Sequence, residues 1–326
     1  MRPIAYALLL GFGFASGAEA QPKVDFKTEP GRVDLLLDGK LATRYLTGAD
    51  VPKPIFWPVL AGGVPVTRAW PMDTSIKGES TDHPHQKSFW FCHGDVIPVG
   101  KTPKAKIKGI EGVDFWSVAK GHGDIRLKSM KGPMKSGNEV ILDTENEWLG
   151  GKLLVLKEHR VMTFRPAPGG WLIVFKIDLT APDHAVIFGD TKEGALGLRI
   201  NDQMRADKVG NGQIRIPGKK GEKDCWGQKA PWCDYAGAVD GKKVGVTVFA
   251  APSNPQPTCW HVRGYGLMAA NPFGRWEKAK FPGAKGEKEL VRLEPGQTLT
   301  LRYAVHVYEG ERSEPVIASL ATQLWK

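Results

Sequence analysis

Hydrophobic residues alternate with polar ones along most of this chain, and glycine or proline interrupts the alternation every few residues. A period of two places successive side chains on opposite faces of a strand, whereas a helix needs a period near 3.6. Glycine (39 residues) and proline (24 residues) are abundant enough to supply turns between many short strands. The pattern therefore predicts an all-β protein.

The alternating and β-branched runs are interpreted as strands. They cover residues 33–38, 40–46, 55–59, 87–96, 113–118, 124–130, 139–147, 153–164, 171–179, 186–188, 196–200, 243–250, 259–262, 288–293 and 298–308. Asp38-Gly39 predicts a tight hairpin turn, and the runs from 124 to 179 predict an antiparallel meander. The one predicted helix, 314–326, is short and C-terminal. This many strands favours a large antiparallel β-sandwich.

The first twenty residues have the features of a signal peptide. Arg2 precedes an apolar run over 4–15, and Ala18-Glu19-Ala20 is a small-x-small cleavage site. The run is too short to span a bilayer. We therefore expect residues 1–20 to be removed, residues 21–326 to form a single domain, and the protein to be exported to the periplasm or the cell exterior.

The chain carries a net charge of +10, with its lysines concentrated in loops. It has no basic helix and no zinc-finger or RNA-binding signature, so nucleic acid is not an expected partner. For an exported protein, this charge suits an anionic polysaccharide or a cell envelope, or else a soluble surface without a partner. The motifs of serine hydrolases, zincins, NTPases and Rossmann oxidoreductases are absent.

Four cysteines are present, and export would permit disulfides. Cys225 and Cys233 lie eight residues apart in a loop-like segment and form the best candidate pair. Cys92 and Cys259 lie in strand-like, aromatic segments and could equally be buried free thiols.

Three of the eight histidines fall within eleven residues: His83, His85 and His93. The first two precede a predicted strand, and the third lies on it. Imidazoles at this spacing can bind a metal, transfer protons or hydrogen-bond sugar hydroxyls. The alternatives are a polar loop capping the sheet edge for the first two, and for His93 a buried ring satisfied by Asp95 or a backbone carbonyl.

A second polar cluster follows residue 252. Alternation places His261 and Arg263 on one face of a strand, where arginine would suit a carboxylate or sulfate, or a structural ion pair. Trp260 and Tyr265 could stack on a sugar ring or pack in the core. Asn271 precedes a proline and suits either a ligand contact or a turn.

A third candidate is Glu193, in a glycine-containing turn between two predicted strands. This position suits a general base held on a rigid scaffold, or a solvated turn residue. Arg199 could orient the glutamate or bind an anion. The charged triplet at 158–160 is interpreted as an exposed sheet face.

These clusters resemble the bacterial family catalogued as PmoA-like, or "methane oxygenase PmoA". The resemblance spans about residues 30–310 and is carried by VPVTR (64–68), DHPH (82–85), WFCHGD (90–95), VDFW (113–116), EGALGLR (193–199), PSNP (252–255), WHVR (260–263) and YGLMAANPFG (265–274). Gln86 departs from the third basic or histidine residue that is expected after the histidine pair. A membrane oxygenase subunit is rich in spanning helices, and this sequence has none.

The resemblance implies an exported protein of polysaccharide-degrading bacteria, with a sandwich similar to the galactose mutarotase-like group. The leading hypothesis is a carbohydrate-active protein for an acidic or modified sugar. Glu193 would be the base and His85 or His93 the acid, and the substrate would contact His83, Arg199, Trp260, His261, Arg263 and Asn271. A metal-dependent enzyme using His83, His85 and His93 or His261, and a non-catalytic glycan-binding or envelope protein, are the alternatives. The sequence names neither the metal nor the reaction.

Overall fold

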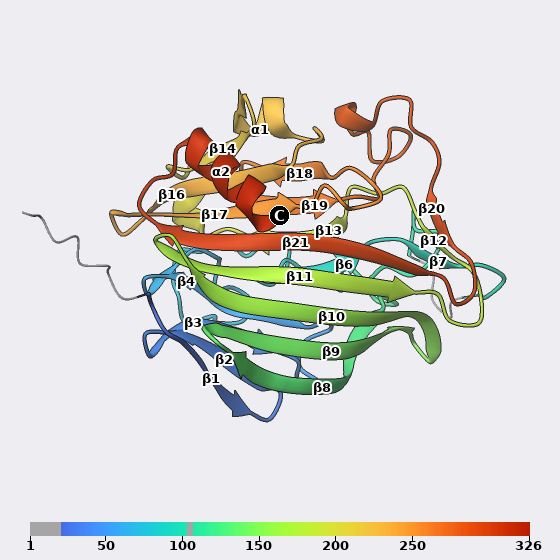
Figure 1. The fold of residues 1–326 in the computed structure, drawn as a ribbon. Coiled ribbons are helices and arrows are strands. Elements are labelled where there is room, and N and C mark those ends of the chain that lie inside the picture. Colours follow the sequence, from blue (N-terminus) through green and yellow to red (C-terminus); the bar gives the residue numbers. More distant parts are fainter. Residues whose placement is uncertain (1–20, 103–106) are drawn as a thin grey trace, which may run out of the picture.

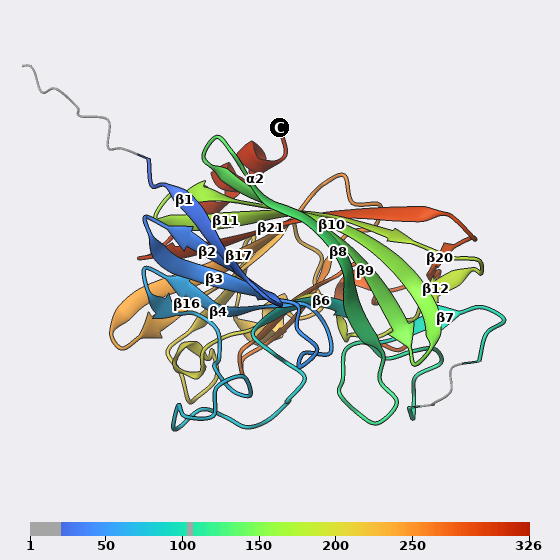
Figure 2. The ribbon, with the colours of Figure 1, turned by 90° about the horizontal axis from the view of Figure 1, so that it is seen from below.

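The computed structural model describes residues 21–102 and 107–326; the predicted signal peptide lies outside the described residues. Two nine-stranded sheets, here called sheet I and sheet II, face one another, and every strand pair in them is antiparallel (Figures 1 and 2). Aromatic side chains meet between them: Phe56 of sheet I lies 6.0 Å from Phe175 of sheet II, and Phe91 lies 6.0 Å from Trp148. The predicted all-β antiparallel sandwich is confirmed.

Sheet I has the strand order β1-β2-β3-β4-β6-β13-β19-β18, with β5 paired to β4. Its strands are β1 (Val24–Glu29), β2 (Arg32–Leu37), β3 (Lys40–Leu46), β4 (Ile55–Ala61), β5 (Val64–Pro65), β6 (Phe89–His93), β13 (Gly194–Arg199), β18 (Cys259–Arg263) and β19 (Leu267–Asn271). Asp38 (φ 49°) and Gly39 (φ 73°) form the predicted turn between β2 and β3, where two left-handed residues match the twist of a hairpin.

Sheet II has the order β15-β14-β16-β17-β21-β11-β10-β9-β8, and β8 to β11 form the predicted meander. Its strands are β8 (Asp124–Ser136), β9 (Glu139–Gly150), β10 (Leu153–Ala167), β11 (Gly170–Thr180), β14 (Gln213–Ile216), β15 (Lys219–Lys220), β16 (Trp232–Val239), β17 (Lys242–Ala250) and β21 (Thr298–Glu309). A third, small sheet joins β20 (Val291–Leu293), β12 (Val186–Phe188) and β7 (Val96–Pro98).

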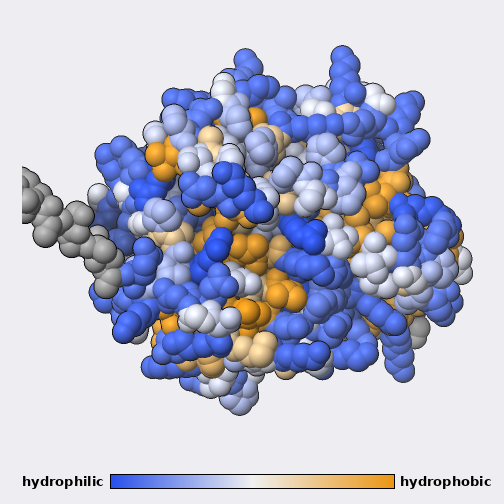
Figure 3. Space-filling view, viewed as in Figure 1, coloured by the Kyte–Doolittle hydropathy of each residue, from blue (hydrophilic) through white to orange (hydrophobic). Residues whose placement is uncertain are grey.

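The helical segments are few. They are α1 (Gly221–Cys225), α2 (Glu314–Leu324) and two 3₁₀ turns, Asp202–Met204 and Pro282–Ala284. The predicted C-terminal helix is thus confirmed as α2, which packs Ile317 against Leu172 and Ala304 on the outer face of sheet II. That face is mainly hydrophilic, with apolar residues gathered over the middle of its strands (Figure 3). In the described part of the chain, no helix has the length and apolarity needed to cross a bilayer.

The strand predicted over 113–118 is wrong. Only Val113 forms a bridge, to Val96. Beyond it, one carboxylate oxygen of Asp114 accepts the backbone N–H groups of Trp116 and Ser117 at 2.7 and 3.0 Å. Such a side-chain turn competes with the sheet ladder and bends the chain away from it.

The charged triplet at 158–160 is also corrected, because two of its members point into the core. Glu158 and Arg160 are almost fully buried and pair at 2.7 Å, whereas the alternate residue His159 is half-buried on the outer face. Glu158 also accepts hydrogen bonds from Asn146 and Trp148 of the neighbouring strand. The buried carboxylate is tolerated because Arg160 supplies a counter-charge and Asn146 and Trp148 supply hydrogen bonds from within the sheet.

The predicted disulfide between Cys225 and Cys233 is not formed. All four cysteines are buried free thiols, as the alternative for Cys92 and Cys259 proposed. Cys225 on α1 and Cys233 on β16 pack in the main core as small apolar side chains. Burial raises the pKa of the Cys225 thiol to about 11, so it stays protonated.

The centre of sheet I is covered on both faces. Every residue of β6, β13 and β19 is buried. Sheet II covers the inner face, and loops must therefore cover the outer one. Gly197 makes room for the Trp90 ring of the adjacent strand, since a Cβ there would lie 2.6 Å from it. Trp116, from the loop that covers this face, packs on the same ring with centroids 5.2 Å apart. The loops on this outer face enclose the candidate site.

Candidate functional site

A cavity of about 550 Å³ lies on the outer face of sheet I. Its walls come from the loop before β6, the loop around Trp116, the turn before β13, and strand β18. Five of the predicted site residues line it: His83, His85, Glu193, His261 and Arg263. Segments almost 180 residues apart are thus brought together at one place.

His83 is fixed on both of its sides. Its ring stacks on Tyr265, with centroids 5.0 Å apart and planes 7° from parallel. Its Nδ1 lies 3.0 Å from a carboxylate oxygen of Asp82. The ionised carboxylate favours the tautomer with its proton on Nδ1, which leaves Nε2 for a ligand.

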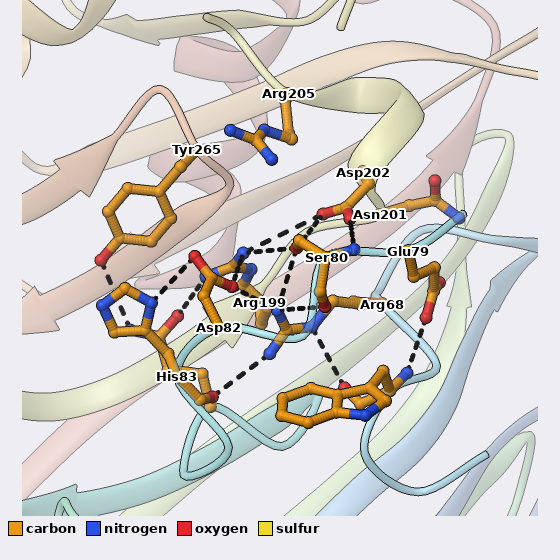
Figure 4. A network of polar contacts seen from close by, with 12 residues as sticks. Arg68, Glu79, Ser80, Asp82, His83, Arg199, Asn201, Asp202, Arg205 and Tyr265 are labelled. Carbon is orange, nitrogen blue, oxygen red and sulfur yellow. Dashed lines mark hydrogen bonds and ion pairs between the residues drawn. The ribbon is translucent and has the colours of Figure 1, made fainter. Parts of the chain in front are cut away.

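Asp82 is held by two arginines that are fully buried (Figure 4). One oxygen accepts from Arg68 and from Arg199, each at 2.7 Å. Partial burial favours the neutral acid, but Arg199, His83 and Arg68 outweigh it and lower the pKa of Asp82 to about 2. Ser80 accepts from the same two arginines, which ties the loop to β13. The result is a carboxylate that stays ionised and cannot rotate.

Arg199 does not line the cavity. It lies beneath the cavity, donates 2.7 Å to Gln86 Oε1, and stacks 4.7 Å from the centre of the Tyr265 ring. Gln86, the residue that departs from the expected motif, thus accepts from an arginine that a basic residue would repel. Arg199 was predicted to orient Glu193 or to bind an anion, and its position supports neither role. Arg199 orients Asp82 instead.

His85 is kept neutral. Burial lowers its pKa to about 4, and the positive charge of Lys53 acts in the same direction. Lys53 is itself buried and donates to the backbone carbonyl of Trp116 at 3.1 Å. The Trp116 ring lies 6.4 Å from His85 across the cavity wall. At neutral pH His85 can hydrogen-bond a hydroxyl but is not an imidazolium acid.

His261 has one ring nitrogen occupied. Its Nδ1 lies 2.8 Å from the backbone carbonyl of Lys192, and since a carbonyl only accepts, Nδ1 carries the proton. Burial lowers the pKa of His261 to about 3. The ring is therefore neutral, with Nε2 as the nitrogen left to accept a hydrogen bond or a proton.

Glu193 is the residue after Lys192 and lies in the same turn, before β13. Thr191 donates its hydroxyl to one carboxylate oxygen of Glu193 at 2.6 Å. Asn271 is buried beneath the turn, where its amide nitrogen donates to the carbonyls of Thr191 and Lys192 at 3.0 and 3.1 Å. Asn271 therefore supports the Glu193 turn. Its Oδ1 also accepts from the backbone N–H groups of Phe273 and Gly274 at 2.9 and 2.8 Å, as expected for the turn predicted at Asn271-Pro272.

Like Arg199 and Asn271, two further predicted residues do not line the cavity. His93 is fully buried, and its Nε2 donates to the Gly189 carbonyl at 2.9 Å while Phe273 packs 4.8 Å away. Burial lowers its pKa to about 4. Trp260 is also buried, and its indole N–H donates to the Ala230 carbonyl. Both have the core roles that were the alternatives.

Arg263 lines the cavity while donating to Glu222 at 2.9 Å. Glu222 itself lines the cavity, as do Trp116 and Asp114, and none of the three had been assigned to a site. Asp82, which lies in the DHPH motif (82–85), was not predicted as a site residue either. Its position next to His83 was the one available signal, because a carboxylate beside a histidine commonly orients the ring.

The metal hypothesis finds no preformed ligand set. Over residues 21–102 and 107–326, no three histidine, cysteine, aspartate or glutamate side chains are close enough to hold a metal ion. His83 and His85 are neighbours, with ring centroids 5.6 Å apart, but His93 points away from them into the core.

Replacing Asp82 with asparagine should release His83 from its fixed tautomer. The charged hydrogen bonds to Arg68 and Arg199 become weaker neutral ones, and solvent reaches part of this carboxylate, so we expect a loss of about 1–2 kcal/mol in unfolding free energy. Ring ¹⁵N shifts should show His83 changing from one tautomer to a mixture. Asp73→Asn, an exposed carboxylate on Ser75, is the matched control. An unchanged His83 spectrum would contradict the positioning role.

The fold and the cavity define a β-sandwich with a histidine- and glutamate-lined cavity on one sheet. The chain belongs to a family of unknown function, DUF6807, whose model matches residues 32–322. No curated protein matches it.

Solved structures similar to the chain include carbohydrate-active proteins. One is the galactosidase domain of the alpha-galactosidase–sucrose kinase AgaSK (8% identity, 88% of this chain, 42% of that chain, TM-score 0.42). Another is the GH36 alpha-galactosidase AgaA from Geobacillus stearothermophilus, in complex with raffinose (10% identity, 89% of this chain, 41% of that chain, TM-score 0.40). The chain spans about two fifths of the length of each. A galactose mutarotase related enzyme from Lactobacillus acidophilus is covered almost completely (12% identity, 89% of this chain, 98% of that chain, TM-score 0.34).

Proposed function

We propose that this is an exported carbohydrate-active protein that binds an acidic or modified sugar unit in the cavity and transfers a proton to or from it. The supporting observation is the convergence of three imidazoles and a carboxylate, His83, His85, His261 and Glu193, in one aromatic-walled cavity. The membership in the PmoA-like family remains a prediction from the sequence motifs.

The cavity chemistry suits a sugar. Sugar C–H faces pack on aromatic rings, which Trp116, Tyr265 and His83 provide. Sugar hydroxyls both donate and accept, and they need partners whose protons are fixed. The volume, about 550 Å³, lies within the usual range for small-molecule sites.

The roles follow from the protonation states. Glu193 acts as the base, because its turn is supported from beneath and its carboxylate lines the cavity. The Nε2 atoms of His83 and His261 accept hydrogen bonds from hydroxyls. His85 is neutral at pH 7 and hydrogen-bonds a sugar hydroxyl, in place of the acid role that the sequence predicted.

Glu193→Gln should abolish turnover while leaving the fold intact. Removing a general base costs about 10²–10⁴-fold in rate. We would screen purified protein against mono- and oligosaccharides by saturation-transfer NMR and follow bound ligands for new proton signals. Glu277→Gln, the same change at an exposed surface site, should behave as wild type.

The outcomes separate the alternatives. Binding without any product, in wild type and variant alike, would make the protein a non-catalytic glycan-binding protein. Turnover that survives in Glu193→Gln would remove Glu193 from the base role. If the wild-type protein binds no sugar at all, the proposed function is wrong.

A further inference from the structure

A second cavity of about 430 Å³ adjoins the first, and we call it the lysine compartment. Thr191, Lys192, Glu193, Arg263 and Ile110 line both cavities. The turn that carries Glu193 therefore lies at their junction. A ligand longer than one sugar unit can pass over this turn from one cavity to the other.

The lysine compartment carries an excess of usable positive charge. Lys192, Arg263, Lys278 and Lys280 line it, together with three carboxylates. Glu193 is at the junction, and the other two carboxylates, Asp95 and Asp190, are buried.

Both buried carboxylates are occupied by backbone groups. Asp190 accepts from the N–H groups of Arg275, Lys278 and Ala279 at 2.7, 2.6 and 3.1 Å. Asp95 accepts from Gly112 at 2.7 Å and Glu111 at 3.3 Å. These carboxylates fix the loops around the compartment; both add negative charge near Lys278, but among the described residues neither forms an ion pair with a lysine that lines the compartment.

The ammonium groups are available to a ligand. Neither Lys192 nor Lys280 has a carboxylate partner within ion-pair distance among the residues that the structure describes. Lys278 pairs with Glu111, but both side chains are exposed, and such a pair contributes little. Lys280 Nζ lies 6.0 Å from the centre of the Trp276 ring. An anionic group entering the compartment would therefore meet two ammonium groups without a described carboxylate partner, one of them on an aromatic ring, and a third held weakly.

We infer that the ligand is an acidic oligosaccharide of at least two units, with one unit in the histidine cavity and a carboxylate- or sulfate-bearing neighbour in the lysine compartment. The inference rests on the proposed function and extends it by adding the second unit and its charge. The linkage between the two units then lies over Glu193. A neutral or single-unit sugar fills only the first cavity.

The test compares Lys278→Gln/Lys280→Gln with Lys40→Gln/Lys242→Gln. The first pair lines only the lysine compartment. The second removes the same charge from exposed hairpin positions. The probes are an array of defined glycans of one to four units in neutral, uronate and sulfated forms, followed by calorimetry on the best of each form.

Acidic probes of two or more units should bind wild-type protein at least tenfold more tightly than their neutral counterparts. The compartment variant should lose that tenfold, leave monosaccharide binding unchanged, and differ from the control variant, which should retain wild-type affinity. The uronate and sulfated arms then identify the anionic group.

Equal binding of acidic and neutral probes, or an unchanged affinity in the compartment variant, would overturn the inference. If monosaccharide binding nevertheless depends on His261 and Glu193, the proposed function stands without the second unit. Absence of all sugar binding by wild-type protein would defeat both.

Discussion

Replacing Arg160 with methionine should lower the unfolding free energy by about 3–5 kcal/mol, the usual effect of removing one partner from a buried ion pair. Glu158 is inaccessible to solvent and lies 2.7 Å from this guanidinium. Without it, the carboxylate keeps the N–H groups of Asn146 and Trp148 as hydrogen-bond donors but loses its counter-charge. Methionine preserves most of the packing volume against the Phe91 ring, which lies 5.4 Å from the guanidinium, so the loss reports the charge.

Urea unfolding followed by circular dichroism measures this loss. Arg165→Met, on the same strand, is the control, because Arg165 pairs with Glu139 at 3.5 Å in solvent and should cost less than about 1 kcal/mol. Adding Glu158→Gln to Arg160→Met should recover part of the stability, since no unpaired charge then remains. Equal effects of the two arginine substitutions would show that the buried pair contributes no more than a surface pair.

Lowering the pH should destabilise the protein already at pH values well above those at which carboxylates titrate. An unfolded histidine takes up a proton near pH 6.5, but His93 and His306 do so in the folded protein only near pH 4, because burial lowers their pKa values. Between these values the unfolded chain binds more protons, so stability decreases as pH falls from 6.5 towards 4. Each residue contributes roughly 3 kcal/mol to that decrease.

The structure gives the physical reason for His93. Its Nε2 proton is committed to the Gly189 carbonyl, and Nδ1 has no hydrogen-bond partner within residues 21–102 and 107–326. A second proton would therefore be buried without an acceptor. His306 is similarly committed through Nε2 to the Pro168 carbonyl.

Unfolding free energies measured from pH 7 to pH 4 test this expectation. His93→Gln and His306→Gln should each flatten the pH dependence by about 3 kcal/mol, whatever they do to stability at pH 7. His122→Gln, at a partly exposed loop position, is the control substitution. Parallel curves for all three variants would refute the assignment.

Alternation predicted the sheets well where one strand face meets solvent. In β9 to β11, buried and accessible residues alternate, and the meander was evident from the sequence. It failed at Glu158 and Arg160 because charged residues occupy both strand faces, and the side chains that donate hydrogen bonds to the buried Glu158 lie on another strand. The period of two alone could not tell which face was the core.

The site was predicted in part. Neighbours in sequence, such as His83 and His85, could be grouped because a loop delivers both. Asp82 could not be assigned, since one arginine that holds it is Arg199, 117 positions away. His93 was misplaced for a related reason: its strand is buried on both faces, so alternation gave no solvent-facing side.

The Lys192 carbonyl accepts both from the His261 ring and from the Asn271 amide, one residue before Glu193. The separation of His261 and Glu193 is thereby set by a single peptide unit and not by the lengths of the surrounding loops. Loops on this face can lengthen, shorten or change composition across relatives without respacing the two groups. In this architecture, the ligand can therefore change while the proton-transfer geometry is kept.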